Sequence, residues 1–210
     1  HVHYAIPHAY AGYMAQQMLR EHGKNIPMVT TLHGTDITLV GQHPFYKPAV
    51  QFSINQSNVV TSVSADLKKK TNELFQLDKE ISVVPNFIDA SKYVFPPADC
   101  QRTLIAKDTE RVVTHVSNFR KVKRIPDVIE IFDRIQQQVP AKLMMVGDGP
   151  EREHAERLCE EKGIQDRVVF LGNSNEIDRI LCFSDLFLLP SVSESFGLAA
   201  LEAMINRTPV

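Results

Sequence analysis

The sequence has almost no net charge, and it has no long run of apolar residues. Its 210 residues include 23 Lys and Arg against 25 Asp and Glu, which gives a formal charge of −2 at pH 7. A chain with this balance has no general attraction for nucleic acid or anionic membranes, so any basic site must be local. No apolar run approaches the roughly 20 residues that span a bilayer, and no signal peptide is visible. We therefore expect neither a nucleic-acid partner nor a membrane partner.

Cysteine is also scarce. Cys100, Cys159 and Cys182 are odd in number and far apart in the sequence. This usage predicts a reducing compartment, the cytoplasm, with neither a disulfide framework nor a zinc site. His1 and His3 form an H-x-H pair, but no carboxylate or cysteine cluster accompanies them, so we expect no metal site. The dinucleotide fingerprint G-x-G-x-x-G is absent, which counts against a dehydrogenase.

What the chain does contain is a regular alternation of apolar and helix-forming segments. Its 43% hydrophobic content is ample for buried cores. Alternating βα units predict an α/β fold with parallel sheets covered by helices on both faces, and a ligand at the carboxyl ends of the strands. The expected strands cover residues 1–6, 26–32, 58–63, 80–85, 111–117, 141–146, 167–171 and 186–190, and the expected helices cover 9–21, 46–54, 64–75, 125–138, 151–162, 175–183 and 196–205.

Residues 86–102 interrupt this alternation. With Pro85 included, the segment has three prolines and a mixed polar composition, which is typical of a connection. We therefore predict two domains, residues 1–90 and residues 91–210. The chain begins at His1 without a methionine and stops at Val210, where a new strand would begin, so we expect a fragment of a longer fold.

The segment from Ser191 to Met204 carries the strongest functional signal. An apolar strand, a short polar loop and a helix follow one another here, and the first-turn N–H groups of such a helix form an anion site. Glu194 precedes the helix and Glu202 lies eight residues further on. Ionised carboxylates are strong acceptors for hydroxyl donors. A phosphate site flanked by two such acceptors predicts a nucleotide-sugar ligand.

A basic cluster follows the expected strand 111–117. It holds four cations within five positions: Arg120, Lys121, Lys123 and Arg124. One interpretation is a solvated helix N-terminus, but cations are disfavoured at that end of a helix. The favoured interpretation is a diphosphate site, where the charge of a leaving group is stabilised without a proton.

Three other strand ends carry weaker signals. Gly147 and Gly149 follow the strand 141–146, and Gly172 ends the strand 167–171. Each is also explained by ordinary turn chemistry or a plain strand terminus. His33, followed by Gly34, ends the strand 26–32 and is placed to meet a substrate, although a core or capping histidine is the alternative. His115 lies inside a strand and is predicted to be a core residue.

The run from Glu194 to Glu202, E-S-F-G-L-A-A-L-E after an apolar strand, resembles the E-x7-E signature of the retaining GT-B glycosyltransferases of family four. The resemblance implies two Rossmann-like parallel-sheet domains facing a cleft, both truncated here, in a metal-independent enzyme without a cofactor. The implied catalytic residues are His33, Lys123 and Glu194. The implied donor-binding residues are Asn118, Arg120, Lys123, Gly147, Gly172, Glu194, Ser195, Phe196, Gly197, Leu198 and Glu202.

The same resemblance implies individual roles. His33 would contact the transferred sugar, Glu202 would accept from the ribose hydroxyls, and Glu194 would accept from the sugar hydroxyls. The family has an Arg/Lys pair after the strand that corresponds to 111–117. This sequence departs from the usual G-R-x4-K form, because with Lys123 aligned Asn118 stands at the position of the usual Arg.

Further segments narrow the resemblance. Residues 1–9, 30–38, 86–89, 115–124 and 146–151 are similar to bacterial family members that transfer N-acetylglucosamine from UDP-N-acetylglucosamine to L-malate in the first step of bacillithiol biosynthesis. This implies a UDP-sugar donor, a small carboxylic-acid acceptor near Tyr4 and Thr31, a cytoplasmic enzyme and a possible homodimer. It also implies front-face attack, with the departing diphosphate taking the acceptor proton.

Other functions stay open at this point. One is a family-four transferase with another sugar donor or with a glycan or lipid acceptor. A second is a non-catalytic nucleotide-sugar binding module, and a third is a related epimerase or phosphorylase on the same architecture. The lack of a basic amphipathic helix argues against a membrane-bound acceptor.

Overall fold

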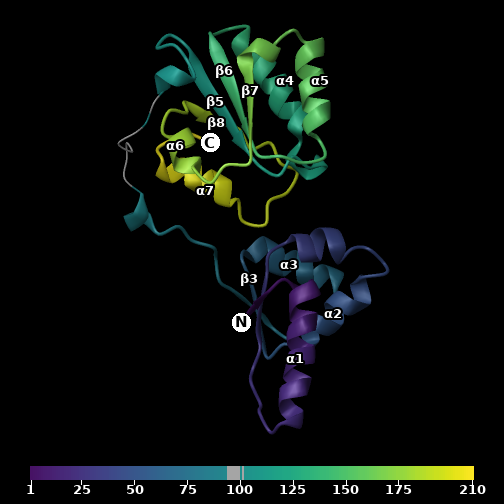
Figure 1. The fold of residues 1–210 in the computed structure, drawn as a ribbon. Coiled ribbons are helices and arrows are strands. Elements are labelled where there is room, and N and C mark those ends of the chain that lie inside the picture. Colours follow the sequence, from purple (N-terminus) through teal and green to yellow (C-terminus); the bar gives the residue numbers. More distant parts are fainter. Residues whose placement is uncertain (94–99, 101) are drawn as a thin grey trace. The chain divides into compact units, whose positions relative to one another are not determined.

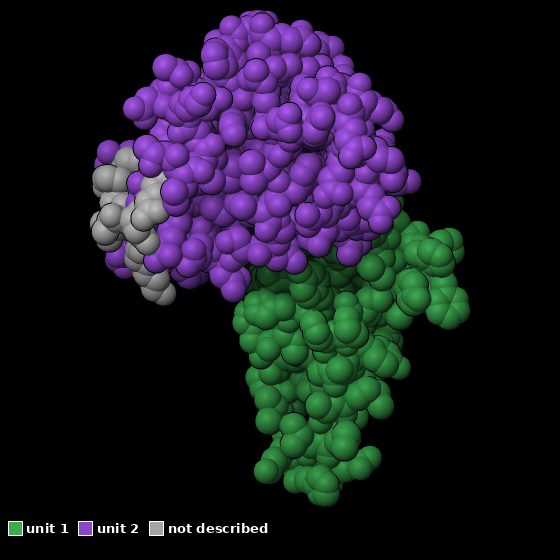
Figure 2. Space-filling model, turned by 45° about the horizontal axis from the view of Figure 1, so that its top comes forward, with its two compact units in different colours: residues 1–86, 194–196 green, residues 87–193, 197–210 purple. Residues whose placement is uncertain are grey.

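The computed structural model describes residues 1–93, 100 and 102–210, and for Lys92 it describes the backbone alone. The described residues form two compact units, which Figure 2 colours separately. Unit 1 contains His1–Asn86 and Glu194–Phe196, and unit 2 contains Phe87–Ser193 and Gly197–Val210. Part of the connection predicted at 86–102, namely residues 94–99 and 101, lies outside the described residues.

Unit 1 is built on a four-stranded sheet in the order β1-β2-β3-β4, and every pair of neighbours is parallel, as predicted. The register joins His3 to Thr31 and Thr31 to Thr61. The strands are β1 (Val2–His3), β2 (Val29–Leu32), β3 (Val59–Ser62) and β4 (Ile81–Val83), and the helices and helical turns are η1 (Ala5–Ala9), α1 (Tyr10–Glu21), η2 (Thr35–Val40), α2 (Lys47–Gln56) and α3 (Ala65–Leu74).

Helix α3 shows how the sequence sets a helix start. The Ser64 hydroxyl accepts a hydrogen bond of 3.1 Å from the Leu67 N–H, which caps the helix as predicted. Asp66 in the first turn favours the positive end of the helix dipole and pairs with Lys70 at 2.7 Å. On the opposite face Leu67 is buried in the core of unit 1. The cap and this burial together fix where α3 lies on the sheet.

Unit 2 has its own four-stranded parallel sheet, in the order β7-β6-β5-β8. Its strands are β5 (Arg111–Val116), β6 (Ala141–Val146), β7 (Val168–Gly172) and β8 (Leu186–Phe187), and its helices and helical turns are η3 (Ala90–Lys92), η4 (Arg102–Leu104), η5 (Lys121–Lys123), α4 (Ile125–Gln136), α5 (Arg152–Glu161), η6 (Gln165–Arg167), α6 (Ile177–Leu181) and α7 (Leu198–Ile205).

Helices cover both faces of the sheet in unit 2. Leu143 and Met145 pack with Phe132 of α4 in one core cluster. Because side chains alternate along a strand, Met144 points to the other face, where it packs with Val112 and Phe183. Figure 1 shows α4 and α5 on one side of this sheet and α6 and α7 on the other. The predicted α/β layering is therefore confirmed.

The last predicted strand and helix are shorter than expected. β8 ends at Phe187 rather than at residue 190, although the Leu188 N–H still donates to Thr114 O at 2.9 Å. Pro190 has no N–H, so the ladder cannot continue through it. Gly197 has a φ of 87°, which lies outside the helical range, and α7 therefore begins at Leu198 rather than at residue 196.

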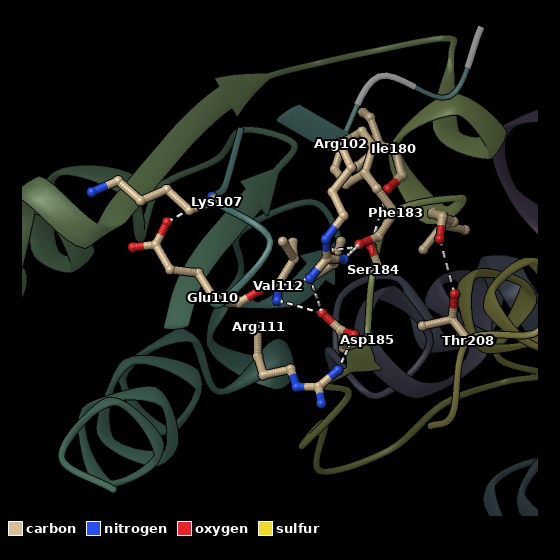
Figure 3. Close-up of polar contacts among 12 residues, drawn as sticks. Arg102, Lys107, Glu110, Arg111, Val112, Ile180, Phe183, Ser184, Asp185 and Thr208 are labelled. Atoms are coloured by element: carbon tan, nitrogen blue, oxygen red, sulfur yellow. Dashed lines mark hydrogen bonds and ion pairs between the residues drawn. The ribbon is translucent and has the colours of Figure 1, made fainter. Parts of the chain in front are cut away.

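A partly buried carboxylate, Asp185, links the segments around the start of β5 to the loop before β8 (Figure 3). Asp185 accepts hydrogen bonds from the Val112 N–H (2.8 Å), from Arg102 (2.7 Å) and from Arg111 (3.0 Å). Burial raises the pKa of Asp185, but these three donors outweigh it, so the pKa lies below its ordinary value. The carboxylate thus fastens the segment before β5 and the start of β5 to the loop before β8.

The prediction that the chain has no disulfide is wrong. Cys100 and Cys182 form a disulfide with their Cα atoms 6.1 Å apart, although 82 positions separate them in the sequence. Cysteine spacing carries no information on such pairs, because the fold brings distant segments together. Cys159 is the odd residue. It is free and lies on the buried face of α5, and burial, with nearby Glu156 and Glu160, raises the pKa of its thiol to about 11.

Within the described ranges, no helix combines the length and apolar character that a membrane span requires.

Candidate active site

The carboxyl ends of neighbouring strands bring the predicted donor-binding residues of unit 2 to one edge of its sheet. Val116 at the end of β5 pairs with Val146 at the end of β6, and Val146 pairs with Gly172 at the end of β7. The residues that follow these strands therefore emerge side by side. They include Asn118, Arg120, Lys123, Gly147 and Gly172.

Gly147 permits a close approach of two of these loops. Its φ is 118°, and a Cβ atom at this position would lie 1.8 Å from the carbonyl oxygen of Ser117. Its N–H donates to Gly172 O at 2.8 Å, so the turn after β6 is tied to the end of β7 as well. At Gly149 a Cβ atom would lie 2.7 Å from the carbonyl oxygen of Phe119, so this position also has no room for a side chain. The glycines thus set the position of the loop that carries the basic cluster.

The four cations of the basic cluster have different surroundings. Arg124 adopts a left-handed backbone with φ of 52° and pairs with Asp127 in the first turn of α4. Arg120 is exposed, and Lys123, in η5, is half-buried. The Lys123 N–H donates to Arg120 O at 2.8 Å, which keeps these two residues on one turn. Arg124 is therefore directed toward α4, and Arg120 and Lys123 stay in the turn at the strand-end edge.

Glu202 lies in α7 and is half-buried. Burial raises its pKa, and Asp178 raises it further. Tyr93 is close to the same two carboxylates: burial raises the pKa of its phenol most, and the charges of Glu202 and Asp178 raise it further. Nothing in the sequence pattern pointed to Tyr93, because an isolated aromatic residue in a connection has no characteristic spacing.

His115 is buried, as predicted, and it links two segments of unit 2. Its Nδ1 lies 2.8 Å from the carbonyl oxygen of Leu188, which can only accept, so Nδ1 carries the proton. In the neutral ring Nε2 then accepts from the Ser117 hydroxyl at 2.7 Å. His115 thereby holds the segment after β8 to the loop after β5.

The predicted residues of unit 1 also lie together. Tyr4 follows β1, and its N–H donates to Thr31 O at 2.9 Å. The rings of Tyr4 and His33 have their centroids 4.9 Å apart. The Thr31 hydroxyl is buried and has two partners, His1 Nε2 and the Thr61 hydroxyl, each at 2.7 Å. Tyr4 is the more exposed of the two predicted acceptor residues.

A buried carboxylate, Asp36, organises this part of unit 1. It accepts from the N–H groups of Ala5 (2.9 Å), Gly34 (2.9 Å) and His33 (3.2 Å), and only 2% of the residue is exposed. It therefore joins the segment after β1 to the segment after β2. The sequence placed Asp36 three residues after His33, but no local pattern showed that it would bridge to Ala5.

His33 is partly buried, and its ring lies beside the rings of His3 and Tyr4. Burial lowers its pKa, His3 lowers it further, and Asp36 opposes both. The net shift is downward, so the ring is neutral at pH 7. Among the described residues no group of three or more His, Cys, Asp or Glu side chains could hold a metal ion.

The structure thus gathers the predicted residues in two sets. Unit 1 holds Tyr4, Thr31 and His33 together with Glu194, Ser195 and Phe196, and unit 2 holds Asn118, Arg120, Lys123, Gly147, Gly172, Gly197, Leu198 and Glu202.

Family models identify the class of protein that these two parallel α/β units form, which is that of the glycosyltransferases. This chain belongs to the family described as glycosyl transferases group 1, whose model matches residues 100–210. Residues 1–92 match the model described as glycosyltransferase family 4.

Among curated proteins, the chain is 46% identical over 210 residues to N-acetyl-alpha-D-glucosaminyl L-malate synthase of Bacillus anthracis, covering 100% of this chain and 54% of that protein. It is 28% identical over 203 residues to an uncharacterized glycosyltransferase of Methanocaldococcus jannaschii, covering 90% of this chain and 52% of that protein. The chain therefore spans about half the length of these relatives.

Solved structures agree on the fold. Anabaena Alr3699/HepE in complex with UDP and glucose is similar with a TM-score of 0.79 at 23% identity, over 96% of this chain and 55% of that one. Sucrose-phosphate synthase from Thermosynechococcus elongatus also has a TM-score of 0.79, at 21% identity, over 99% of this chain and 54% of that one. The predicted GT-B type of fold is confirmed.

Proposed function

We propose that the protein is a retaining, metal-independent glycosyltransferase that transfers N-acetylglucosamine from UDP-N-acetylglucosamine to the hydroxyl of L-malate. The observation that carries this proposal is the 46% identity to the L-malate synthase of Bacillus anthracis along all 210 residues. Because the chain spans 54% of that relative, the activity is assigned to the whole protein. The reaction would be the first step of bacillithiol biosynthesis.

In this proposal the donor diphosphate is bound by residues of the strand-end edge of unit 2. Arg120 and Lys123 supply positive charge, and Asn118 supplies a polar side chain next to them. The exposure of Arg120 at the end of β5, and the pairing of Arg124 with Asp127, support this choice among the four cations. The N–H groups from Ser195 to Leu198, including those of Phe196 and Gly197, add further donors at the start of α7.

The remaining groups orient the sugar and the nucleoside. Ionised Glu202 accepts from the ribose hydroxyls, and Glu194 accepts from hydroxyls of the transferred sugar. Backbone groups at Gly147 and Gly172 contact the nucleotide. Neutral His33 hydrogen-bonds the sugar near the reacting carbon, and Tyr4 and Thr31 contact the acceptor.

The mechanism follows from this set of groups. The acceptor oxygen attacks the anomeric carbon on the face from which UDP departs, so that the configuration is retained. The bond from the anomeric carbon to the diphosphate oxygen breaks as the new bond forms, and the diphosphate takes the proton of the acceptor hydroxyl. Lys123 and Arg120 stabilise the charge of the leaving group, which is the task that a metal ion performs in other transferases. We also propose a homodimer, no cofactor and no nucleic-acid partner. The cytoplasmic location is proposed from the similarity to the L-malate synthase alone, because the disulfide removes the support that the cysteine usage gave it.

The test is UDP release from UDP-N-acetylglucosamine by the full-length protein, with and without L-malate and with EDTA present throughout. Release that depends on L-malate is the expected result. Release without such dependence would keep the transferase and reject the acceptor. UDP binding without release in either condition would favour another sugar donor or a binding module.

A further inference from the structure

The imidazole of His3 contacts that of His33. His3 ends β1 and pairs in register with Thr31, so the side chain of His33, two residues further along the neighbouring chain segment, comes within its reach. His3 Nδ1 lies 2.7 Å from His33 Nε2, and the two ring centroids are 5.0 Å apart. The distance is that of a hydrogen bond, so one proton lies between the two nitrogens.

That shared proton determines what the other nitrogen of His33 can do. If His3 Nδ1 donates, neutral His33 carries its proton on Nδ1, and Nδ1 is a donor. If His33 Nε2 donates to His3, Nδ1 of the neutral ring is an acceptor. In both cases His33 Nε2 is occupied by His3, and His33 Nδ1 is the nitrogen left to meet a ligand hydroxyl.

The surroundings hold the pair in place. The His8 Nδ1–H donates to the backbone oxygen of His3 at 2.7 Å, and the His1 ring centroid lies 4.6 Å from that of His3. Asp36 accepts from the backbone N–H of His33, and the Tyr4 ring packs beside the His33 ring. Burial and His3 keep the pKa of His33 low against the opposing charge of Asp36. His3 is exposed, so its contact with His33, rather than core packing, explains its orientation.

We propose that His3 is a positioning residue. Its Nδ1 orients the His33 ring and sets whether His33 Nδ1 donates to, or accepts from, a hydroxyl of the transferred sugar. This inference rests on the proposed function, in which His33 contacts that sugar.

Three substitutions of His3 separate positioning from structure. Asn places an amide near the site of His Nδ1 and can either donate or accept, so His3→Asn keeps the contact. His3→Phe keeps an aromatic ring and removes the contact. His3→Asp can only accept, so it forces the proton onto His33 Nε2 and adds a charge that favours imidazolium. Since His3 is exposed, we expect all three variants to fold.

The first measurement is steady-state kinetics of the full-length variants between pH 5 and 9. We expect His3→Phe to lower kcat about tenfold, by analogy with other groups that orient a reacting residue, with KM for the donor changed less than twofold. His3→Asn should recover most of kcat. His3→Asp should move the acid limb of the profile upward by about one pH unit, because a carboxylate stabilises protonated His33.

The second measurement follows the His33 ring by ¹⁵N NMR in a pH titration, which needs no activity. A pKa of His33 that rises in His3→Asp, while His22→Asp leaves it unchanged, would support the contact even if no donor is turned over. His22 is an exposed histidine of the same unit, at the end of α1, and serves as the matched control.

Unchanged His33 titration in His3→Asp would overturn the inference whatever the enzyme activity. Wild-type kcat in His3→Phe, with the malate-dependent reaction established, would overturn it too. A failure of UDP release in the unsubstituted protein would instead count against the proposed function, because the NMR titration tests the contact of His3 with His33 independently of any sugar.

Discussion

The two units build their parts of the candidate site from different materials. In unit 1 the contacts are made by titratable side chains: His1 contacts the Thr31 hydroxyl, and His3 contacts His33. Asp36 also bridges two segments there. In unit 2 the turn after β6 is positioned by backbone groups at Gly147 and Gly172, although the His115 side chain also links two segments there. We therefore expect pH to act on unit 1 through ring protonation, whereas the geometry of the turn after β6 in unit 2 should depend on steric space.

The largest effect is expected for Gly147→Ala in unit 2. The new Cβ would lie 1.8 Å from Ser117 O at a φ of 118°, so two strand-end loops must separate. We expect unit 2 to lose about 4 kcal/mol of unfolding free energy, because strain and a backbone clash add. Because the chain has no tryptophan to serve as a fluorescence probe, urea unfolding followed by far-UV circular dichroism measures this loss.

The matched control for this substitution is Gly163→Ala. Gly163 also has a positive φ, 66°, but a Cβ there meets nothing within 4 Å. Its cost should be the left-handed backbone alone, about 1 kcal/mol. Equal losses in the two variants would show that the loop contact at Gly147 does not matter.

These loops also show what the sequence could predict. The apolar runs of parallel strands are a local pattern, so the sequence alone predicted the two sheets and the edge of the unit 2 sheet where the donor-binding residues lie. The E-x7-E run and the glycine turns are local too, which is why Glu202 and Gly147 were found. Their assigned roles stay predictions until variants are assayed.

Contacts between distant segments have no local sequence pattern that would predict them. The disulfide from Cys100 to Cys182 joins positions 82 apart, and Asp36 accepts from Ala5 across 31 positions. The contact of His3 with His33 spans 30 positions. No spacing rule encodes such pairs, because they depend on strand register, which a single sequence does not specify at the level of individual side chains.

The next effect in size is expected for Asp36→Asn in unit 1. The amide can accept from one or two of the three N–H groups, but its NH₂ would face another donor in a buried place. Leaving that donor unsatisfied should cost about 2 kcal/mol. The midpoint of urea unfolding of unit 1, followed at the amide resonance of Ala5, measures the change.

Asp66→Asn is the control for loss of a carboxylate. Asp66 pairs with Lys70 on the exposed face of α3, where 58% of its side chain is accessible. Such a pair contributes about 0.5 kcal/mol. A cost for Asp36→Asn no larger than that for Asp66→Asn would contradict the bridging role of Asp36.

The smallest of these effects is expected for Glu202→Gln, which tests whether a titrating carboxylate of unit 2 binds the nucleotide. Loss of a charged acceptor for the ribose hydroxyls should weaken UDP binding about tenfold at pH 7.5. Glu161→Gln, an exposed change at the end of α5, should leave UDP affinity unchanged. Isothermal titration calorimetry of the full-length proteins with UDP measures both.

The pH dependence of that binding makes the test sharper. Burial and Asp178 raise the pKa of Glu202 above the ordinary value of 4.5, so its ionised form is lost earlier as the pH falls. UDP affinity of the unsubstituted protein should therefore decline from pH 7 toward pH 5, and the slope should be smaller in Glu202→Gln. Equal slopes would mean that Glu202 does not bind the ribose and that titration of this carboxylate does not contribute to UDP binding.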